Sequence, residues 1–549
     1  MENLIQLLKD RMGSAIEITT SQISQKYLKN TECFDSETFI IVKPLSSSVI
    51  GDLVLLGNEF SDDPDMAFSI TPISTGKNWG YGSAQPITGS KHTLLLDLSD
   101  FTGIRFFDPQ NGVVTLEPGV TQEQLHEFLT SNNYPYMVPV TGAGPTVSIV
   151  GNALERGYGI TPIADHFAAV TSIKGFLGDG SFYESSLSSM NESLNAKAND
   201  CYVDKTFKWK HGPYLEGLFT QSGNMIVTEM TILLARQKPH FNSFYMRFYS
   251  EDSFDLAYSI TKEIFYNLEG VIGSINLMDR RRVASMVGLN PNGPRAHKVM
   301  SKSQLDDISR QFDVPEWTLV GTIYGTKSVC NAAKKDIKRI VRKRADQILF
   351  SDSLLIMLGE LFTQSSNRKY LRSIKEQIAK LIEGKKIMQG IPSEVALPLA
   401  YWRNPTHDLQ SQKRLNPAMD GCGLLWYAPL VPANSKDMQK LIDMVRTIAP
   451  IYNIEPMITF TNLSGSSTDS TIPIVFNKND PQAVKDAHAC LEALFKAGIQ
   501  QGFIPYRLNI DQQKNLDPNS TCWKASGKIA HALDPKGVIS PDRYNPFKP

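Results

Sequence analysis

The sequence predicts a mixed α+β protein with more than one domain. Short apolar segments bounded by Gly, Pro and Asn alternate with longer segments whose apolar residues recur every three or four positions, which indicates strands interspersed with helices. A chain of 549 residues is long enough to bury a large core and to divide into domains. The pattern changes near residues 238–240, where a second series of strands and helices begins.

Residues 1–239 are expected to form the first domain. Its N-terminal helix carries charges within it and lacks the basic-then-apolar order of a signal peptide. The expected elements are a helix over 1–18, a strand, loop and helix over 39–60, a strand over 69–75, two strands, a turn at Asn111-Gly112, a third strand and a helix within 92–129, a hairpin turning at Asp179-Gly180, and a strand pair over 222–236.

Residues 240–499 are expected to form a second α+β domain that contains an antiparallel sheet. The expected elements are a strand over 241–250, helices over 253–268, 334–349 and 366–386, strands within 423–432, 457–464 and 470–477, and a helix over 480–502 that ends at Gly502.

The charge and composition exclude several function classes. Basic and acidic residues balance at 56 each, so nothing indicates nucleic acid or an anionic membrane as a partner. The basic stretch 334–349 has no interleaved aromatic residue and is expected to be a solvated helix face. No apolar run is long enough for a membrane span. The six cysteines and nine histidines lack metal-binding spacing, which predicts no metal and reduced thiols in a cytoplasmic protein.

Two long glycine-rich loops, 71–86 and 140–167, stand out. Glycines permit positive φ, and a run of free backbone N–H groups forms a concave site for an anion such as a pyrophosphate. The two common phosphate motifs do not fit. Gly76-Lys77-Asn78 lacks the hydroxyl that follows the lysine of a P-loop, and the segment 142–147 has only two of the three Rossmann glycines. A dinucleotide bound here therefore needs another fold.

Five segments resemble the vanillyl-alcohol oxidase and para-cresol methylhydroxylase family of FAD enzymes, in the family's order. They are Ile73-Ser74-Thr75-Gly76-Lys77-Asn78-Trp79-Gly80-Tyr81-Gly82, Leu116-Glu117-Pro118-Gly119-Val120-Thr121, Gly151-Asn152-Ala153-Leu154-Glu155-Arg156-Gly157, Gly212 to Ser222, and Leu533 to Pro541. The resemblance spans nearly the whole chain. It implies an FAD-binding domain of the para-cresol methylhydroxylase type with two α+β subdomains in residues 1–239, a cap or substrate domain in 240–499, and a return of 500–549 to the FAD domain.

The resemblance also implies the residues that hold FAD. They are Ser74, Thr75, Gly76, Lys77, Asn78, Trp79, Gly80, Tyr81, Gly82, Ser83, Pro118, Gly142, Gly144, Pro145, Thr146, Ser148, Gly151, Asn152, Glu155, Arg156, Gly157, Gly159, Ile160, Asp165, Gly223, Ile226, Val227, Arg543 and Asn545.

The family's phenol-oxidising members place two tyrosines and an arginine around the phenolate oxygen, and Tyr81, Tyr506 and Arg507 stand at these positions. A fixed cation and hydroxyl donors favour the anion of a phenol whose free pKa is about 10, and they could equally hold a carboxylate. The alternative for a Tyr-Arg pair is simple packing.

Two departures leave the acid–base partner open. The segment 141–145 lacks the aspartate of the family's alcohol oxidases, and Ile160 replaces a tyrosine. Asp469 is a candidate base, with a turn-capping aspartate as the alternative reading. Arg403 is a candidate contact to flavin or substrate.

The family often attaches its flavin through a histidine or tyrosine of the cap. The aligned segment 420–429 has no histidine, so we expect non-covalent FAD, with Tyr427 and Cys422 as fallback attachment sites.

These features together predict an FAD-dependent oxidoreductase that moves a hydride from a carbon of a phenolic, alcohol or carboxylate-bearing small molecule to flavin N5. Oxygen or a protein acceptor would reoxidise the flavin, and family habit implies a homodimer. The alternatives are a hydroxy-acid dehydrogenase, a biosynthetic flavoenzyme that desaturates or cyclises a natural-product intermediate, and a flavin-binding protein without turnover.

Overall fold

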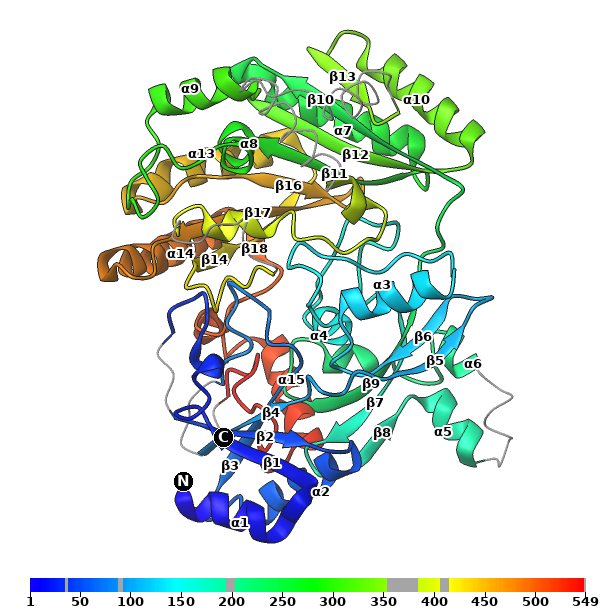
Figure 1. Ribbon diagram of the computed structural model, residues 1–549, viewed down its shortest axis with the longest axis vertical. Helices are drawn as coiled ribbons and strands as arrows, with labels where there is room; N and C mark the ends of the chain where they lie inside the picture. Colours follow the sequence, from blue (N-terminus) through cyan, green and yellow to red (C-terminus); the bar gives the residue numbers. More distant parts are fainter. Residues whose placement is uncertain (35–37, 87–91, 194–202, 353–383, 405–413, 548–549) are drawn as a thin grey trace.

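The computed structural model describes residues 1–34, 38–86, 92–193, 203–352, 384–404 and 414–547. These residues form three sheets. Two smaller sheets lie in the lower half of Figure 1, and one large sheet with its helices forms the upper half. The result is the mixed α+β architecture that the sequence predicts.

The N-terminal sheet has the strand order β1-β2-β4-β3, with parallel pairs β2–β4 and β4–β3. Its elements are α1 (Glu2–Met12), β1 (Ile16–Thr20), β2 (Ile40–Pro44), α2 (Ser48–Glu59), β3 (Phe68–Ile73) and β4 (His92–Asp97). The expected helix over 1–18 is therefore too long. Gly13, at φ 53°, ends it, and the β-branched residues that follow suit a strand.

The second sheet is antiparallel, in the order β5-β6-β9-β7-β8. Its elements are β5 (Ile104–Asp108), β6 (Val113–Leu116), α3 (Gln122–Ser131), α4 (Ile149–Leu154), β7 (Val170–Leu177), β8 (Phe182–Glu184), α5 (Ser186–Ser193), α6 (Val203–Thr206) and β9 (Met225–Leu233). The strand pair expected over 222–236 is wrong. This stretch is the single central strand β9, which has no turn residue inside it and pairs with β6 on one side and β7 on the other.

The large antiparallel sheet has the order β13-β10-β12-β11-β16-β17-β15-β18, and β14 also pairs with β17. Its strands are β10 (His240–Phe248), β11 (Ile272–Asp279), β12 (Trp317–Gly325), β13 (Gln347–Phe350), β14 (Gly423–Tyr427), β15 (Pro429–Pro432), β16 (Thr459–Asn462), β17 (Ser467–Phe476) and β18 (Ile504–Pro505). The proposed division at residues 239 and 240 falls between β9 and β10, which belong to different sheets.

Helices accompany this sheet. They are α7 (Phe254–Leu268), α8 (Arg280–Val287), α9 (Lys302–Phe312), α10 (Lys327–Val341), α13 (Ser435–Ile448) and α14 (Pro481–Gln501). The apolar faces of all but α8 and α9 pack into the main core cluster of the sheet, whereas α8 and α9 pack into a separate cluster. Helix α14 ends at Gly502, whose φ of 82° is the left-handed conformation that glycine adopts at low cost.

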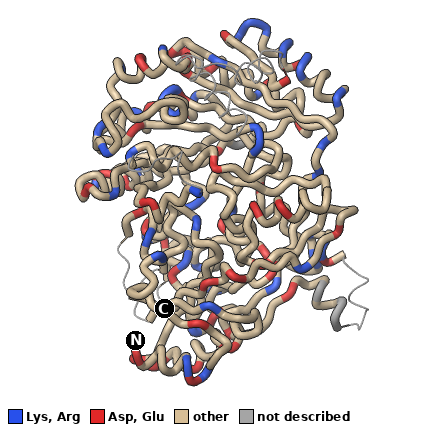
Figure 2. The backbone as a smooth tube through the Cα atoms, viewed as in Figure 1, with Lys and Arg blue, Asp and Glu red and all other residues tan. Residues whose placement is uncertain are grey.

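The helix expected over 334–349 is partly wrong, because Arg342 and Lys343 have positive φ and β13 follows them. The basic face that remains on α10 is visible at the top of Figure 2. Lys334 and Arg339 form ion pairs there with Asp352 and Asp336. Most of the other charged stretch, 366–386, lies outside the described residues.

The chain then leaves the large sheet and returns to the N-terminal one. After α15 (Thr521–Leu533), Ile539 bridges to Ile70 of β3. The backbone N–H of Ile70 donates to Val538 at 2.7 Å, and that of Ser540 donates to Ile70 at 3.0 Å. The C-terminal segment therefore crosses from the edge of the large sheet to the core of the smaller one.

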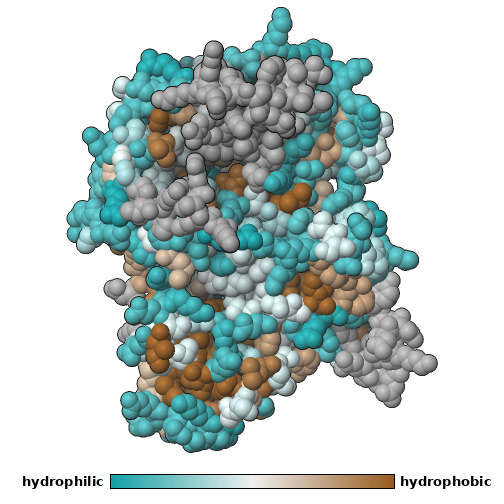
Figure 3. Space-filling model, viewed as in Figure 1, coloured by the Kyte–Doolittle hydropathy of each residue, from teal (hydrophilic) through white to brown (hydrophobic). Residues whose placement is uncertain are grey.

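On the face drawn in Figure 3, the coloured part of the upper half is mostly hydrophilic, and apolar residues gather near the bottom of the view, where Figure 1 places the N-terminal sheet. Among the described helices, none combines the length and apolar character needed to cross a bilayer.

We expect Gly119→Ala to lower the free energy of unfolding by about 1–3 kcal/mol, because a Cβ there would lie 2.3 Å from the backbone oxygen of Ser99 and the backbone must shift. Gly384→Ala is the control, since a Cβ at Gly384 meets no atom of the described residues within 4 Å. Denaturant unfolding of both variants measures the difference. Equal stabilities would contradict this account.

Candidate active site

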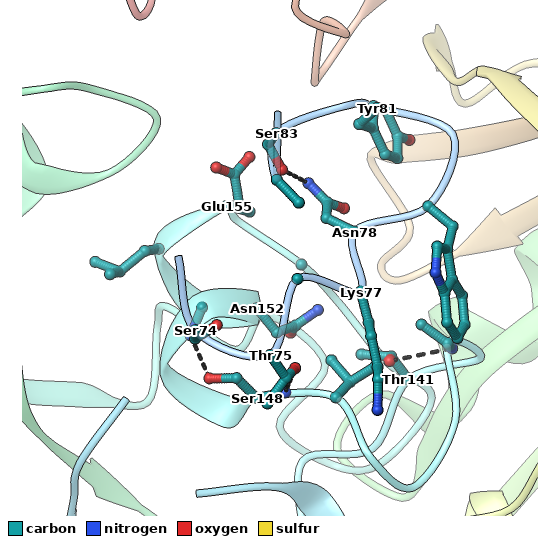
Figure 4. A pocket seen from close by; sticks show the side chains of 18 of the residues that line it. Ser74, Thr75, Lys77, Asn78, Tyr81, Ser83, Thr141, Ser148, Asn152 and Glu155 are labelled. Carbon is teal, nitrogen blue, oxygen red and sulfur yellow. Dashed lines mark hydrogen bonds between the residues drawn. The ribbon is translucent and has the colours of Figure 1, made fainter. Parts of the chain in front are cut away.

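A cavity of about 400 Å³ lies where the two smaller sheets meet the large one. Both glycine-rich loops line it, together with β14, β17, α8 and the chain after β18. Figure 4 shows part of this lining. Ser74, Thr75 and Ser148 lie towards one end of the view, and Tyr81 and Ser83 lie towards the other.

The first loop exposes a run of free backbone donors to this cavity. Among the described residues, none accepts a hydrogen bond from the backbone N–H of residues 75–79. Gly76, at φ 65°, turns the chain within the run. Successive unpaired N–H groups attract anionic oxygens. This loop is therefore suited to the pyrophosphate of a dinucleotide, although it lacks both common phosphate motifs.

A buried carboxylate outside the expected site holds the far end of this loop. Glu32, 2% exposed, accepts hydrogen bonds from the backbone N–H of Gly80 and, at 3.1 Å, from that of Gly82. The Thr31 hydroxyl donates to the same carboxylate at 3.0 Å. Burial raises the pKa of Glu32, and these donors lower it. Glu32 therefore positions the loop without lining the cavity.

Many of the residues expected to hold FAD line the cavity. They are Ser74, Thr75, Gly76, Lys77, Asn78, Trp79, Tyr81, Ser83, Pro118, Gly142, Ser148, Gly151, Asn152, Glu155, Gly157, Val227 and Arg543. Gly80, Gly82, Gly144, Pro145, Thr146, Arg156, Gly159, Ile160, Asp165 and Ile226 lie outside this lining, and Gly223 and Asn545 line a neighbouring cavity that shares Arg543.

The structure brings Tyr81, Tyr506 and Arg507 together. The guanidinium of Arg507 lies 4.7 Å from the ring centre of Tyr81 and 5.5 Å from that of Tyr506. Burial raises the pKa of both phenols. Burial opposes the charge of Arg507, but the phenols of Tyr506 and Tyr81 outweigh it and raise the pKa of the guanidinium. Arg507 is thus a permanent buried cation beside the rings of two tyrosines.

Arg507 also joins the two flavin-type loops. It donates to Asn78 Oδ1 at 3.0 Å and to the backbone oxygen of Glu155, while its Nε has no partner. The described residues place no carboxylate within ion-pair distance of it. This cation therefore retains capacity for an external anion.

Asp469 lies in β17 and not in a turn, so the turn-capping reading is wrong. It is 4% exposed and accepts a hydrogen bond from the Tyr158 hydroxyl, while its Oδ1 has no partner. Burial raises the pKa of Asp469 to about 8, against the lowering effects of Tyr158 and Arg507. This carboxyl group can therefore gain or lose a proton near neutral pH.

Arg403 does not lie in the cavity lining. It is fully buried and donates to the backbone oxygens of Asn453 at 2.7 Å and Lys298 at 3.0 Å. The fallback attachment residues Cys422 and Tyr427 are also fully buried outside the lining, whereas Leu424 lines it.

The sequence did not single out Tyr158 or Arg282, both of which line the cavity. Tyr158 lies 5.7 Å from Tyr506 between ring centres, two positions before the Ile160 that stands at the family's tyrosine position. A tyrosine two residues from the position where the family's tyrosine is replaced could have identified Tyr158 as a candidate. For Arg282, within three consecutive arginines, the sequence offers no such signal.

Comparison with known proteins agrees with this site. Residues 65–186 match the family described as FAD binding domain. The chain is 27% identical to 1'-carboxy-chondrochloren decarboxylase of Chondromyces crocatus, over 99% of this chain and 97% of that protein. It is 24% identical to the flavoprotein subunit of 4-cresol dehydrogenase [hydroxylating] of Pseudomonas putida, over 86% and 82% of the two chains.

Solved structures share the fold. Substrate-bound p-cresol methylhydroxylase superposes with a TM-score of 0.82 at 21% identity, over 99% of this chain and 96% of the other. The isoeugenol complex of 4-ethylphenol oxidase from Gulosibacter chungangensis gives 0.83 at 19% identity, over 100% and 97%.

The free loop amides, the cavity and these matches define an FAD-dependent oxidoreductase. Within that class the chain is similar, over most of its length, to the flavoprotein subunit of 4-cresol dehydrogenase, and it shares the fold of p-cresol methylhydroxylase and 4-ethylphenol oxidase, which agrees with the resemblance that its motifs indicate. The prediction of an enzyme that uses FAD is confirmed. No group of three or more His, Cys, Asp or Glu that could hold a metal ion occurs in the described parts of the chain.

We expect Asp469→Asn to gain stability relative to the wild type as the pH rises from 4 to 8. The folded protein holds the Asp469 proton more tightly than the unfolded chain. Its contribution is therefore complete below the pKa of a free aspartate, about 3.9, and is lost as the pH rises through the folded pKa. Thermal unfolding of both proteins across this range measures the change. A difference that does not depend on pH would show that Asp469 has an ordinary pKa.

Proposed function

We propose that this enzyme oxidises a small molecule that carries a phenol, at a saturated carbon attached to the ring. The observation that carries the proposal is the buried Arg507 cation between the phenols of Tyr81 and Tyr506, with no carboxylate paired to it among the described residues. A fixed cation with hydroxyl donors favours the anionic form of a bound phenol. The names of two neighbours, p-cresol methylhydroxylase and 4-ethylphenol oxidase, support a phenol as substrate.

Bound FAD supplies a hydride acceptor for the substrate carbon. The amides of residues 75–79 and the side chains of Ser148 and Asn152 would hold it. The protein must then orient the substrate and manage protons. Arg507, Tyr81 and Tyr506 fix the phenol oxygen. Asp469, with a pKa of about 8, exchanges a proton through the hydroxyl of Tyr158. The apolar lining from Leu397, Leu399 and Trp426 excludes water.

A second candidate function is oxidation with loss of a carboxylate. The relative that is 27% identical is named a decarboxylase of a carboxylated compound. The observation that favours this candidate is Arg282, a further cation in the cavity wall that has no carboxylate within ion-pair distance among the described residues. A hydroxy-acid dehydrogenase would instead place the carboxylate on Arg507, and a desaturating or cyclising biosynthetic enzyme needs the same hydride acceptor. We further propose reoxidation by oxygen or a protein acceptor, and a homodimer in the cytoplasm.

We expect Arg507→Met to lower kcat/KM for 4-ethylphenol by about 100-fold or more, because charge stabilisation at the phenol oxygen is lost. Arg507→Lys should recover part of the activity, since it keeps the charge but not the planar guanidinium. Anaerobic bleaching of the flavin by 4-ethylphenol measures the rate, and the flavin spectrum checks that each variant retains FAD.

Arg310→Met provides the matched control, because Asp307 is the one ion-pair partner of this exposed arginine of α9 among the described residues. It should leave the rate unchanged. Full activity of Arg507→Met would refute the proposed phenol site.

We also expect acid precipitation to release the flavin into the supernatant. No histidine lines the cavity within the described residues, and both fallback attachment residues lie outside the lining. The absorption spectrum of supernatant and pellet decides the point. Yellow colour that remains in the pellet would show a covalent bond.

A further inference from the structure

Three consecutive arginines begin α8, and the structure treats them differently. Arg280 pairs with Asp306 at 2.8 Å and with Glu316 at 2.7 Å. Arg281 pairs with the buried Glu455. Arg282 alone of the three lines the active-site cavity. The two structural arginines are thus neutralised, and the third is left facing the substrate space.

Arg282 has no carboxylate within ion-pair distance among the described residues. Its backbone N–H donates to Asp279 Oδ1 at 2.9 Å, which fixes the start of the helix. Its guanidinium makes one long contact, from Nη1 to the Ser285 hydroxyl at 3.5 Å. Burial lowers the pKa of Arg282 to about 10, against the raising effect of Asp279, so the group remains a cation at neutral pH. A sheltered cation without a close counter-ion is costly unless an anion joins it.

The sheet places Arg282 away from the phenol-binding end. One row across it joins Asn276, Thr461 and Asp469, and the next parallel row joins Met278, Thr459 and Thr471. Equivalent rows lie about 7 Å apart along a strand. Asp469 and Thr471 are two positions apart on β17, so their side chains leave the same face, and Thr471 lines the cavity. Beyond this second row, β11 ends at Asp279 and leads into Arg282.

We propose that Arg282 binds the carboxylate of a substrate whose phenol lies at Tyr81, Tyr506 and Arg507, so that the enzyme selects phenolic acids. This inference rests on the proposed function and adds the opposite end of the substrate. The cavity then offers Arg282 as an anion-binding group in addition to Arg507, and Thr471, Leu424 and Trp426 line the same cavity. A guanidinium matches a carboxylate with two parallel hydrogen bonds, which gives direction as well as charge.

The test uses 4-hydroxycinnamate and 4-hydroxycinnamamide as matched probes. They have the same shape and differ in the charge of one group. Neither has a saturated carbon on the ring, so neither is turned over by the proposed reaction. Titration calorimetry on the FAD-loaded enzyme gives each dissociation constant. We expect the wild type to bind the acid at least about tenfold more tightly than the amide, because the carboxylate meets a sheltered cation.

Arg282→Gln should abolish that preference while changing the affinity for the amide by less than about threefold, because only the charged contact is removed. Arg282→Lys should keep part of the preference. Arg280→Gln removes the same charge from the same helix outside the cavity lining, and it should leave the preference intact.

Three outcomes would overturn the inference. A wild type that binds acid and amide equally would show that no carboxylate site exists. A preference that survives in Arg282→Gln would place the site on another residue. Loss of FAD from Arg282→Gln, seen in its absorption spectrum, would show that Arg282 serves the cofactor. If the wild type binds neither probe, the proposed phenol site itself fails, and that result is distinguishable from the other three.

Discussion

The placement of one buried guanidinium organises the active site. Arg507 reaches Asn78 of the first glycine-rich loop and Glu155 at the end of α4, so it holds together two segments that are 77 residues apart in the chain. A buried charge is tolerated only where polar groups surround it. Asn78 and the phenols beside it provide that environment. Burial of this charge costs free energy, but the same cation lines the cavity in which the reaction would occur.

The large sheet contributes the complementary group. Asp469 on β17 lies within reach of Tyr158 from the second loop, across 311 residues of sequence. Asp469 keeps its proton up to about pH 8, so below that pH it is a neutral acid near the cation Arg507 and the two do not form a pair of opposite charges. Asp469 therefore leaves Arg507 without a neutralising carboxylate and provides a group that can exchange protons. The site needs both parts of the molecule. The large sheet supplies Asp469, and the part with the two smaller sheets supplies both glycine-rich loops, which Arg507 holds together.

Much of this arrangement could be predicted from the sequence, because the residues concerned lie in short contiguous motifs. The glycine loops, the strands around them and the Tyr506-Arg507 pair lie in contiguous motifs, so a resemblance carries them over residue by residue. The position of Tyr158 two residues before Ile160 was a usable local signal, but its hydrogen bond to Asp469 joins residues that are distant in sequence and has no local signature. Arg403 is the opposite case, because it was a candidate contact from the sequence and does not line the cavity. Its charge suggested a ligand contact, but backbone oxygens of two loops take up its donors. Element ends also failed where one backbone angle decides them, as at Gly13 and Arg342.

The short connection after α14 limits the insertions and deletions that this part of the chain can tolerate during evolution. β18 consists of Ile504 and Pro505 alone, paired with β15, and the next two residues are Tyr506 and Arg507. Because Tyr506 and Arg507 follow this short strand directly, a slip of one position in its pairing with β15 would displace both side chains. Insertions and deletions are usually tolerated in surface connections, but here a single added or lost residue would move the cation and the phenol together. The length of this segment is therefore constrained as well as the identity of its side chains.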